Sequence, residues 1–137
     1  MKRIGTLLAV FLLFSALVPS VSAVSPLNDA QIRTLAHFCA ETAPDEPLLV
    51  QMSLAAVIRN RMEDPRYPDT LDGNLACAGF ACAPVRTEDL EQSLWAVRCV
   101  LRGMDPTAGA VQWAKVGSAA AGRMTVTLQA DGWCFGK

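Results

Sequence analysis

The sequence predicts an α+β domain in which three helices precede a small antiparallel sheet. Apolar residues recur at helical spacing in three segments between residues 28 and 101. The segments Ala110–Val116 and Met124–Gln129 resemble strands joined by a Gly/Ala/Ser loop, and Trp133–Phe135 is a candidate third strand. Because the chain after residue 23 contains no repeat, linker or low-complexity tract, we expect residues 24–137 to form one domain.

Residues 1–23 have the features of a secretory signal peptide. Lys2 and Arg3 form a positive start, Leu7–Val18 is an apolar run broken only by Ser15, and Val21-Ser22-Ala23 is a small-residue cleavage site. The apolar run is shorter than the roughly 20 residues that a membrane-spanning helix needs. No second candidate follows, so we expect no integral membrane segment in the mature chain. An uncleaved N-terminal anchor is the alternative.

The charge of the predicted mature domain excludes two classes of partner. Removal of residues 1–23 takes away two of the 12 Lys and Arg residues and leaves all 13 Asp and Glu residues, which gives a formal net charge of −3. A weakly acidic domain lacks the basic surface expected of a nucleic-acid-binding protein. It also lacks the basic stripe that would hold a helix on anionic lipid.

The cysteines of a secreted chain point to disulfides. Two disulfides and one remaining thiol can form, and Cys77 with Cys82 is the first predicted pair because the two lie close together in a loop. A zinc site made of these two cysteines with His37 and Cys39 is the alternative, but its spacing matches no common zinc pattern. We therefore expect neither a metal nor another cofactor. The five cysteines are Cys39, Cys77, Cys82, Cys99 and Cys134.

The first predicted helix carries an acid on its polar side. It begins with Asn28, a favoured N-cap, and stops before Pro44. Glu41, in the last turn, lies opposite the apolar stripe, with His37 and Phe38 one turn back. Glu41 therefore faces solvent or a cleft, and His37 is expected on the surface or on the wall of a cleft. The apolar stripe consists of Ile32, Leu35, Ala36 and Cys39.

The remaining helices are predicted on either side of a long loop. A second helix is predicted from Pro47 to Met62, and its run Leu48–Ile58 is apolar on nearly every side, which predicts a buried central helix. Residues 63–86 contain several prolines and glycines, which predicts a loop. A loop of this length within a compact domain is usually functional or held by contacts with the rest of the domain. A third helix is expected from Thr87, with Gly103 at its C′ position and Trp95 in the core.

Several short motifs follow one another in an order that resembles a known family. Their order is Glu41, Asp45-Glu46-Pro47, Ile58-Arg59-Asn60-Arg61, Pro65-Arg66-Tyr67-Pro68-Asp69-Thr70, Gly79-Phe80, Asp105-Pro106-Thr107 with Gly109-Ala110, and Cys134-Phe135. This order resembles that of the SleB-type cell wall hydrolases, the spore cortex-lytic enzyme family. Those proteins carry E-A-R-G-E-P, a helix ending in N-R, R-F-P-x-[TS], Q-F-S and D-P-T-x-G-A. The resemblance covers about residues 32–135.

The resemblance implies an activity and a catalytic residue. The family is similar to lysozyme-like lytic transglycosylases, so it implies a lysozyme-like catalytic core that cuts peptidoglycan between N-acetylmuramic acid and N-acetylglucosamine. The first Glu of E-A-R-G-E maps onto Glu41. A carboxyl group partly desolvated by Phe38 would keep a proton for the glycosidic oxygen, and one acid suffices to form a 1,6-anhydro product. Inverting hydrolysis would need a second carboxylate about 6.5–9.5 Å away. The candidates are Asp45, Glu46, Asp69 and Asp72.

The resemblance also suggests residues that contact the substrate. Glu46 can correspond to the second Glu of E-A-R-G-E, and Phe80 to the Phe of Q-F-S. Trp113 could stack on a sugar ring or pack against the core, and packing is the preferred interpretation. We nevertheless keep Glu46, Phe80 and Trp113 as candidate substrate-binding residues. Asn60 and Arg61 are expected to be structural and to tie the helix end to the loop that follows it.

Three classes of function follow from these patterns. The preferred one is a secreted, monomeric peptidoglycan lytic enzyme of the cell wall or spore cortex, with peptidoglycan glycan strands as its partner. The second is a peptidoglycan-binding module of the same fold that has lost turnover. Replacement of Q-F-S by Gly79-Phe80-Ala81 favours this second class, whereas retention of Glu41 opposes it. The third is a disulfide-stabilised secreted protein of unrelated function.

Overall fold

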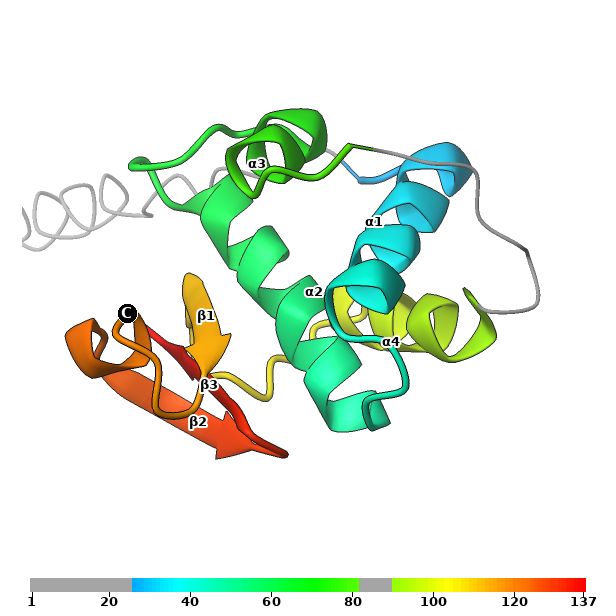
Figure 1. Ribbon diagram of the computed structural model, residues 1–137. Coiled ribbons are helices and arrows are strands. Elements are labelled where there is room, and N and C mark those ends of the chain that lie inside the picture. The colour runs from blue at the N-terminus through cyan, green and yellow to red at the C-terminus, as the bar shows by residue number, and fades with distance from the viewer. Residues whose placement is uncertain (1–25, 82–89) are drawn as a thin grey trace, which may run out of the picture.

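The computed structural model describes residues 26–81 and 90–137, which form helices followed by an antiparallel sheet (Figure 1). The prediction of three helices is corrected to four in the described part of the chain, because the predicted loop contains an additional one. The elements are α1 (Asp29–Thr42), α2 (Leu48–Glu63), α3 (Leu71–Cys77), α4 (Glu91–Leu101), β1 (Gln112–Lys115), the 3-10 helix η2 (Ala121–Arg123), β2 (Val126–Ala130) and β3 (Trp133–Gly136).

Helix α1 begins with the N-cap that the sequence predicts. The Asn28 side chain accepts a hydrogen bond from the Gln31 backbone N–H, and the Gln31 side chain accepts one from the Asn28 N–H. This reciprocal pair is a capping box, which satisfies two donors that a helix start leaves unpaired. Leu35, Ala36 and Cys39 are buried as expected. The apolar face predicted for α1 is therefore confirmed at these three residues, but Phe38, predicted on the opposite side near Glu41, is buried as well.

Helix α2 is the central element of the helical part. In Figure 1 it passes between the sheet on one side and α1 and α4 on the other. Its residues 50–58 are all buried, which confirms the prediction from their apolar run. A helix that is apolar on every side is stable only when other elements cover it all round.

Helix α3 lies within the segment that the sequence predicts to be a loop. Thr70 caps it by accepting a hydrogen bond from the Gly73 N–H, and Leu71 and Leu75, one turn apart, are both buried. The loop prediction was wrong because the Pro and Gly residues of this segment do not interrupt the helix: Pro68 lies before its N-cap, and Gly73 lies within it. In the structure Gly73 lets the Pro68 ring approach the helix, since a Cβ at residue 73 would lie 2.6 Å from the Pro68 Cβ.

Helix α4 is the third helix that the sequence predicts, although Thr87, its expected start, lies outside the described residues. It ends with Gly103 at positive φ, where the Met104 N–H donates to the Cys99 carbonyl, as predicted for a C′ glycine. The prediction for Trp95 was wrong, because its side chain is 54% exposed. The face of α4 that packs into the core consists of Ser93, Ala96, Val97 and Val100.

The sheet has the strand order β1-β3-β2, so that the last strand is central. Both neighbours pair with β3 in antiparallel register, which confirms the predicted third strand. All four residues of β3 are buried. The strands β1 and β2 begin two residues later than the predicted segments, because Ala110 and Val111 belong to the connection that enters the sheet.

A partly buried polar junction fixes the sheet to the end of α2. The Asn60 amide donates to the Asp105 carboxylate and to the Ala110 carbonyl, each at 3.0 Å, and the Arg61 Nε donates to the Val111 carbonyl at 2.6 Å. These two residues are structural, as predicted, but they hold the strand entry rather than the loop after α2. The sequence could not show this, because the partners of Asn60 lie 45 and 50 residues further along the chain.

The described cysteines are free thiols. Cys39 and Cys134 are buried, and burial raises the pKa of the Cys39 thiol, which therefore stays protonated. Cys77 and Cys99 are also unpaired, so two disulfides are not present among these four residues. Cys82, the predicted partner of Cys77, lies outside the described residues. None of the described helices is long and apolar enough to cross a membrane.

Candidate active site

Glu41 and His37 form a hydrogen-bonded pair at the C-terminal end of α1. His37 Nε2 lies 2.9 Å from Glu41 Oε1, and the two residues are one helical turn apart. The His37 side chain is only 5% exposed, whereas the Glu41 side chain is 44% exposed. The carboxylate is therefore half in solvent, as expected for an acid beside a cleft, but it contacts an imidazole rather than being shielded by Phe38. Of the two places expected for His37, the surface or the wall of a cleft, the structure shows the second, since its side chain is buried and lines a pocket.

Three aromatic rings connect this pair to the sheet. The Phe80 ring packs edge-on against His37 at a centroid distance of 5.4 Å and against Phe38 at 5.5 Å. Phe38 in turn meets the Trp113 ring of β1 at 5.7 Å. Phe80 and Trp113 are both partly exposed. The structure thus brings two of the three predicted substrate-binding residues into one aromatic cluster behind Glu41.

Arg61 completes the far end of the cluster. Its guanidinium carbon lies 4.7 Å from the centroid of the Trp113 ring and 4.7 Å from that of the Tyr67 ring. Burial lowers the pKa of Arg61, because the charged form loses hydration. The two aromatic faces and the Val111 carbonyl compensate for part of that loss. Trp113 is thereby fixed between a cation and the core, which confirms a packing role for its ring.

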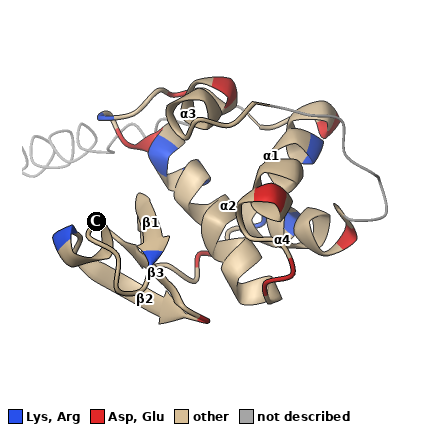
Figure 2. Cartoon of the chain, viewed as in Figure 1, with Lys and Arg blue, Asp and Glu red and all other residues tan. Residues whose placement is uncertain are grey.

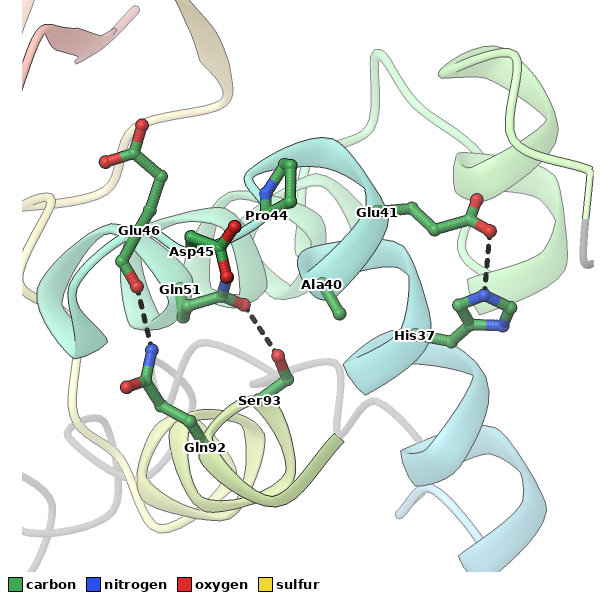
Figure 3. A pocket seen from close by; sticks show the side chains of 9 residues that line it. All are labelled: His37, Ala40, Glu41, Pro44, Asp45, Glu46, Gln51, Gln92 and Ser93. Carbon is green, nitrogen blue, oxygen red and sulfur yellow. Dashed lines mark hydrogen bonds and ion pairs between the residues drawn. The ribbon is translucent and has the colours of Figure 1, made fainter. Parts of the chain in front are cut away.

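A pocket of about 710 Å³ opens beside Glu41, between the end of α1, the start of α2 and α4 (Figure 3). Its floor is polar: the buried Gln51 amide donates to the Ala43 carbonyl at 2.6 Å and accepts from the Ser93 hydroxyl at 2.8 Å. Acidic residues lie at the end of α1 and in the turn that follows it (Figure 2). The lining residues are His37, Ala40, Glu41, Pro44, Asp45, Glu46, Gln51, Gln92 and Ser93.

Glu46 lines the same pocket, but its carboxylate is engaged by the sheet. Glu46 Oε1 accepts a hydrogen bond from Trp133 Nε1 at 3.1 Å and lies 3.5 Å from Lys115 Nζ. Its backbone carbonyl accepts from the Gln92 amide of α4 at 2.8 Å. In Figure 3 the Glu46 and Glu41 side chains point away from each other. The structure therefore does not bring Glu46 together with Phe80 and Trp113.

The other acids considered as a second carboxylate lie in different places. Asp45 lines the pocket from a turn with a positive φ of 59°. Asp69 and Asp72 are exposed, beside and within the first turn of α3. Within residues 26–81 and 90–137, no group of three or more His, Cys, Asp or Glu side chains is arranged to hold a metal ion.

Sequence reasoning missed the roles of His37, Gln51 and Asp105. The spacing of His37 and Glu41, four residues apart on a predicted helix, was the available signal for their contact. Gln51 had a signal too, as a polar residue in an otherwise apolar helix that must find partners when buried. The contacts of Asp105 with Asn60 depend on tertiary packing and had no local signal.

Comparison with known proteins identifies the fold. The catalytic domain of the Bacillus cereus SleB protein superimposes with a TM-score of 0.67 at 22% identity, over 82% of this chain and 94% of that one. The catalytic domain of the germination-specific lytic transglycosylase SleB from Bacillus anthracis gives the same TM-score and identity, over 98% of its chain. No protein-family model matches the chain. The fold is thus that of a SleB catalytic domain.

A curated relative supports the same relationship by sequence. The spore cortex-lytic enzyme of Halalkalibacterium halodurans is 31% identical over 99 residues, which are 69% of this chain. The matched part is 30% of the length of that enzyme. Sequence and fold agree, and the chain belongs to the SleB-type spore cortex-lytic enzyme family.

Proposed function

We propose that the chain is a secreted lytic transglycosylase that cuts peptidoglycan between N-acetylmuramic acid and N-acetylglucosamine, with Glu41 as its catalytic residue. The observation that carries the proposal is the half-exposed Glu41 carboxylate at the edge of a pocket of about 710 Å³. Glu41 also occupies the position of the first Glu in the E-A-R-G-E motif of the family. A cell wall or spore cortex location, and action as a monomer, are part of the proposal.

The reaction needs one group that first gives and then takes a proton. The protonated Glu41 carboxyl donates its proton to the glycosidic oxygen as the bond from that oxygen to C1 of the muramic residue breaks. The resulting carboxylate accepts the proton of the muramic C6 hydroxyl while that oxygen attacks C1. The product carries a 1,6-anhydro ring, and Glu41 is again protonated.

The placement of Glu46 argues against its use as the second carboxylate of a hydrolase. An inverting hydrolase needs a second carboxylate that activates water from the opposite face of the sugar. The Glu46 carboxylate accepts a hydrogen bond from Trp133 and lies beside Lys115, so it is already engaged by the sheet. Transglycosylation requires no such group, because the nucleophile is part of the substrate.

Mass spectrometry of the fragments released from purified peptidoglycan tests this proposal. The chain without residues 1–23 should release fragments with anhydromuramic ends, and Glu41→Gln should abolish release without unfolding the protein, since Gln cannot exchange a proton. Glu63→Gln is the matched control, because Glu63 is similarly exposed at 47% and also contacts a basic residue one turn away, Arg59. Reducing ends would instead indicate hydrolysis.

A binding module without turnover is the second candidate. It is favoured by the neighbours of Phe80, because Gly79 and Ala81 lack the polar side chains of the Q-F-S motif. In that case the chain would be retained on insoluble peptidoglycan and release nothing. Release of fragments by the wild type, with loss in Glu41→Gln, would exclude this candidate.

A further inference from the structure

We propose that His37 is a positioning residue that holds the Glu41 carboxylate in its reactive orientation, an inference that rests on the proposed function. The His37 and Glu41 side chains differ in conformational freedom. An exposed glutamate at a helix end can adopt several rotamers, whereas a buried imidazole is confined by its neighbours. The contact of 2.9 Å between His37 Nε2 and Glu41 Oε1 transfers that restraint to the acid.

His37 can restrain Glu41 because its own ring is fixed. Its side chain is 5% exposed, and the Phe80 ring meets it edge-on at 5.4 Å with an interplanar angle of 88°. Phe80 is itself packed at 87° against Phe38, which is 2% exposed in the core. The orientation of the carboxylate is thus set by a continuous set of contacts that begins in the hydrophobic core.

The contact with His37 gives the two carboxylate oxygens of Glu41 different roles. In the proposed role, Nε2 is the ring nitrogen of His37 that carries the hydrogen, and it donates to Glu41 Oε1 throughout the reaction. The proton that moves is therefore carried by Oε2: it leaves for the glycosidic oxygen and is replaced by the proton of the muramic C6 hydroxyl. His37 neither gives nor takes that proton, so it acts on the reaction only through Glu41.

Two amide variants separate this role from simple filling of a buried site. The Gln side chain can place an N–H where Nε2 of His37 lies, whereas Asn is one methylene shorter and does not reach Glu41. Both are polar and both fit within the volume of His. We expect His37→Asn to lower kcat about tenfold or more with KM changed less than about twofold, and His37→Gln to restore most of kcat. A residue that only supports the fold would lower the melting temperature in both variants without this difference in kcat.

The single histidine of the chain provides a readout independent of turnover. Imidazole NMR signals of the full-length protein belong to His37 alone, and Glu41→Gln should shift them whereas Glu63→Gln should not. Unshifted signals in Glu41→Gln, or full kcat in a folded His37→Asn, would overturn the positioning role while leaving the proposed function intact. Wild-type turnover in Glu41→Gln would overturn both, because Glu41 would then not be the catalytic acid.

Discussion

The Trp133 indole and the Glu46 carboxylate join the two halves of the molecule through a hydrogen bond of 3.1 Å. Glu46 belongs to the turn after α1, and Trp133 is the first residue of the central strand β3, 87 residues further along the chain. The Lys115 ammonium lies 3.8 Å from the centre of the Trp133 ring and 3.5 Å from Glu46 Oε1. This contact holds the pocket side of the helical part against the sheet.

Removal of the Glu46 acceptor should therefore destabilise the fold. Glu46→Ala leaves the indole N–H of the buried Trp133 without its partner, and we expect a loss of about 1–3 kcal/mol in the free energy of unfolding. Glu46→Gln keeps an acceptor oxygen and should cost less. Denaturant titration of both variants, with Trp133→Phe to complete a double-mutant cycle, measures the coupling. Unchanged stability in Glu46→Ala, combined with an increased KM, would instead assign Glu46 to substrate binding.

Asp105 should make the fold sensitive to acid. Burial raises the pKa of its carboxyl group, but hydrogen bonds from Thr107, Asn60 and the Gly109 N–H outweigh burial and leave the pKa below its ordinary value. The folded protein then binds a proton less readily than the unfolded chain. The stabilisation is present above about pH 4, the value for an unfolded aspartate, and is lost as the pH falls through the lower folded pKa.

Asp105→Asn tests this dependence. We expect the variant to lose about 1–3 kcal/mol at neutral pH, because charged hydrogen bonds are replaced by weaker ones. Its stability should also fall less steeply than that of the wild type below pH 4. Thermal unfolding between pH 2 and 7 measures both effects, with Asp69→Asn as an exposed control. Parallel curves for wild type and Asp105→Asn would show that Asp105 is not the group responsible.

Gly136 is required because the backbone of a neighbouring segment passes very close to it. A Cβ at residue 136 would collide with the Thr125 carbonyl oxygen and lie 2.9 Å from its carbon, and both are backbone atoms that cannot rotate away. We expect Gly136→Ala to lower the free energy of unfolding by about 1–3 kcal/mol. Gly122→Ala is the control, since no atom lies within 4 Å of the added Cβ. Equal melting temperatures for the two variants would contradict this prediction.

Arg61 should not be replaceable by lysine. Its planar group lies between the Tyr67 and Trp113 rings and donates through Nε to the Val111 carbonyl, and a lysine has neither that plane nor that donor. We expect Arg61→Lys to cost about 1–3 kcal/mol. Arg66→Lys, in an exposed pair with Asp64, should change stability by about 0.5 kcal/mol or less. Chemical denaturation compares them, and similar losses would indicate that the ring contacts contribute little.

Local patterns predicted most of the helical part. The N-cap of α1, the burial of α2 and the C′ glycine of α4 depend on residues within one or two turns of each other. Such features can be predicted from a short stretch of sequence without knowledge of the tertiary structure. Helix α3 was missed because its seven residues are too few to show a period, and Trp95 was misplaced because its helix has more apolar positions than its buried face accommodates.

The sequence by itself determined the order of the elements other than α3, the family and the position of Glu41 on the polar side of α1. Only the tertiary structure decided what that carboxylate contacts, which aromatic rings lie behind it, and that Glu46 binds the sheet. The physical reason is the range of the interactions. Caps and helical periods act between residues a few positions apart, whereas the contact between Glu46 and Trp133 exists only after the core has packed.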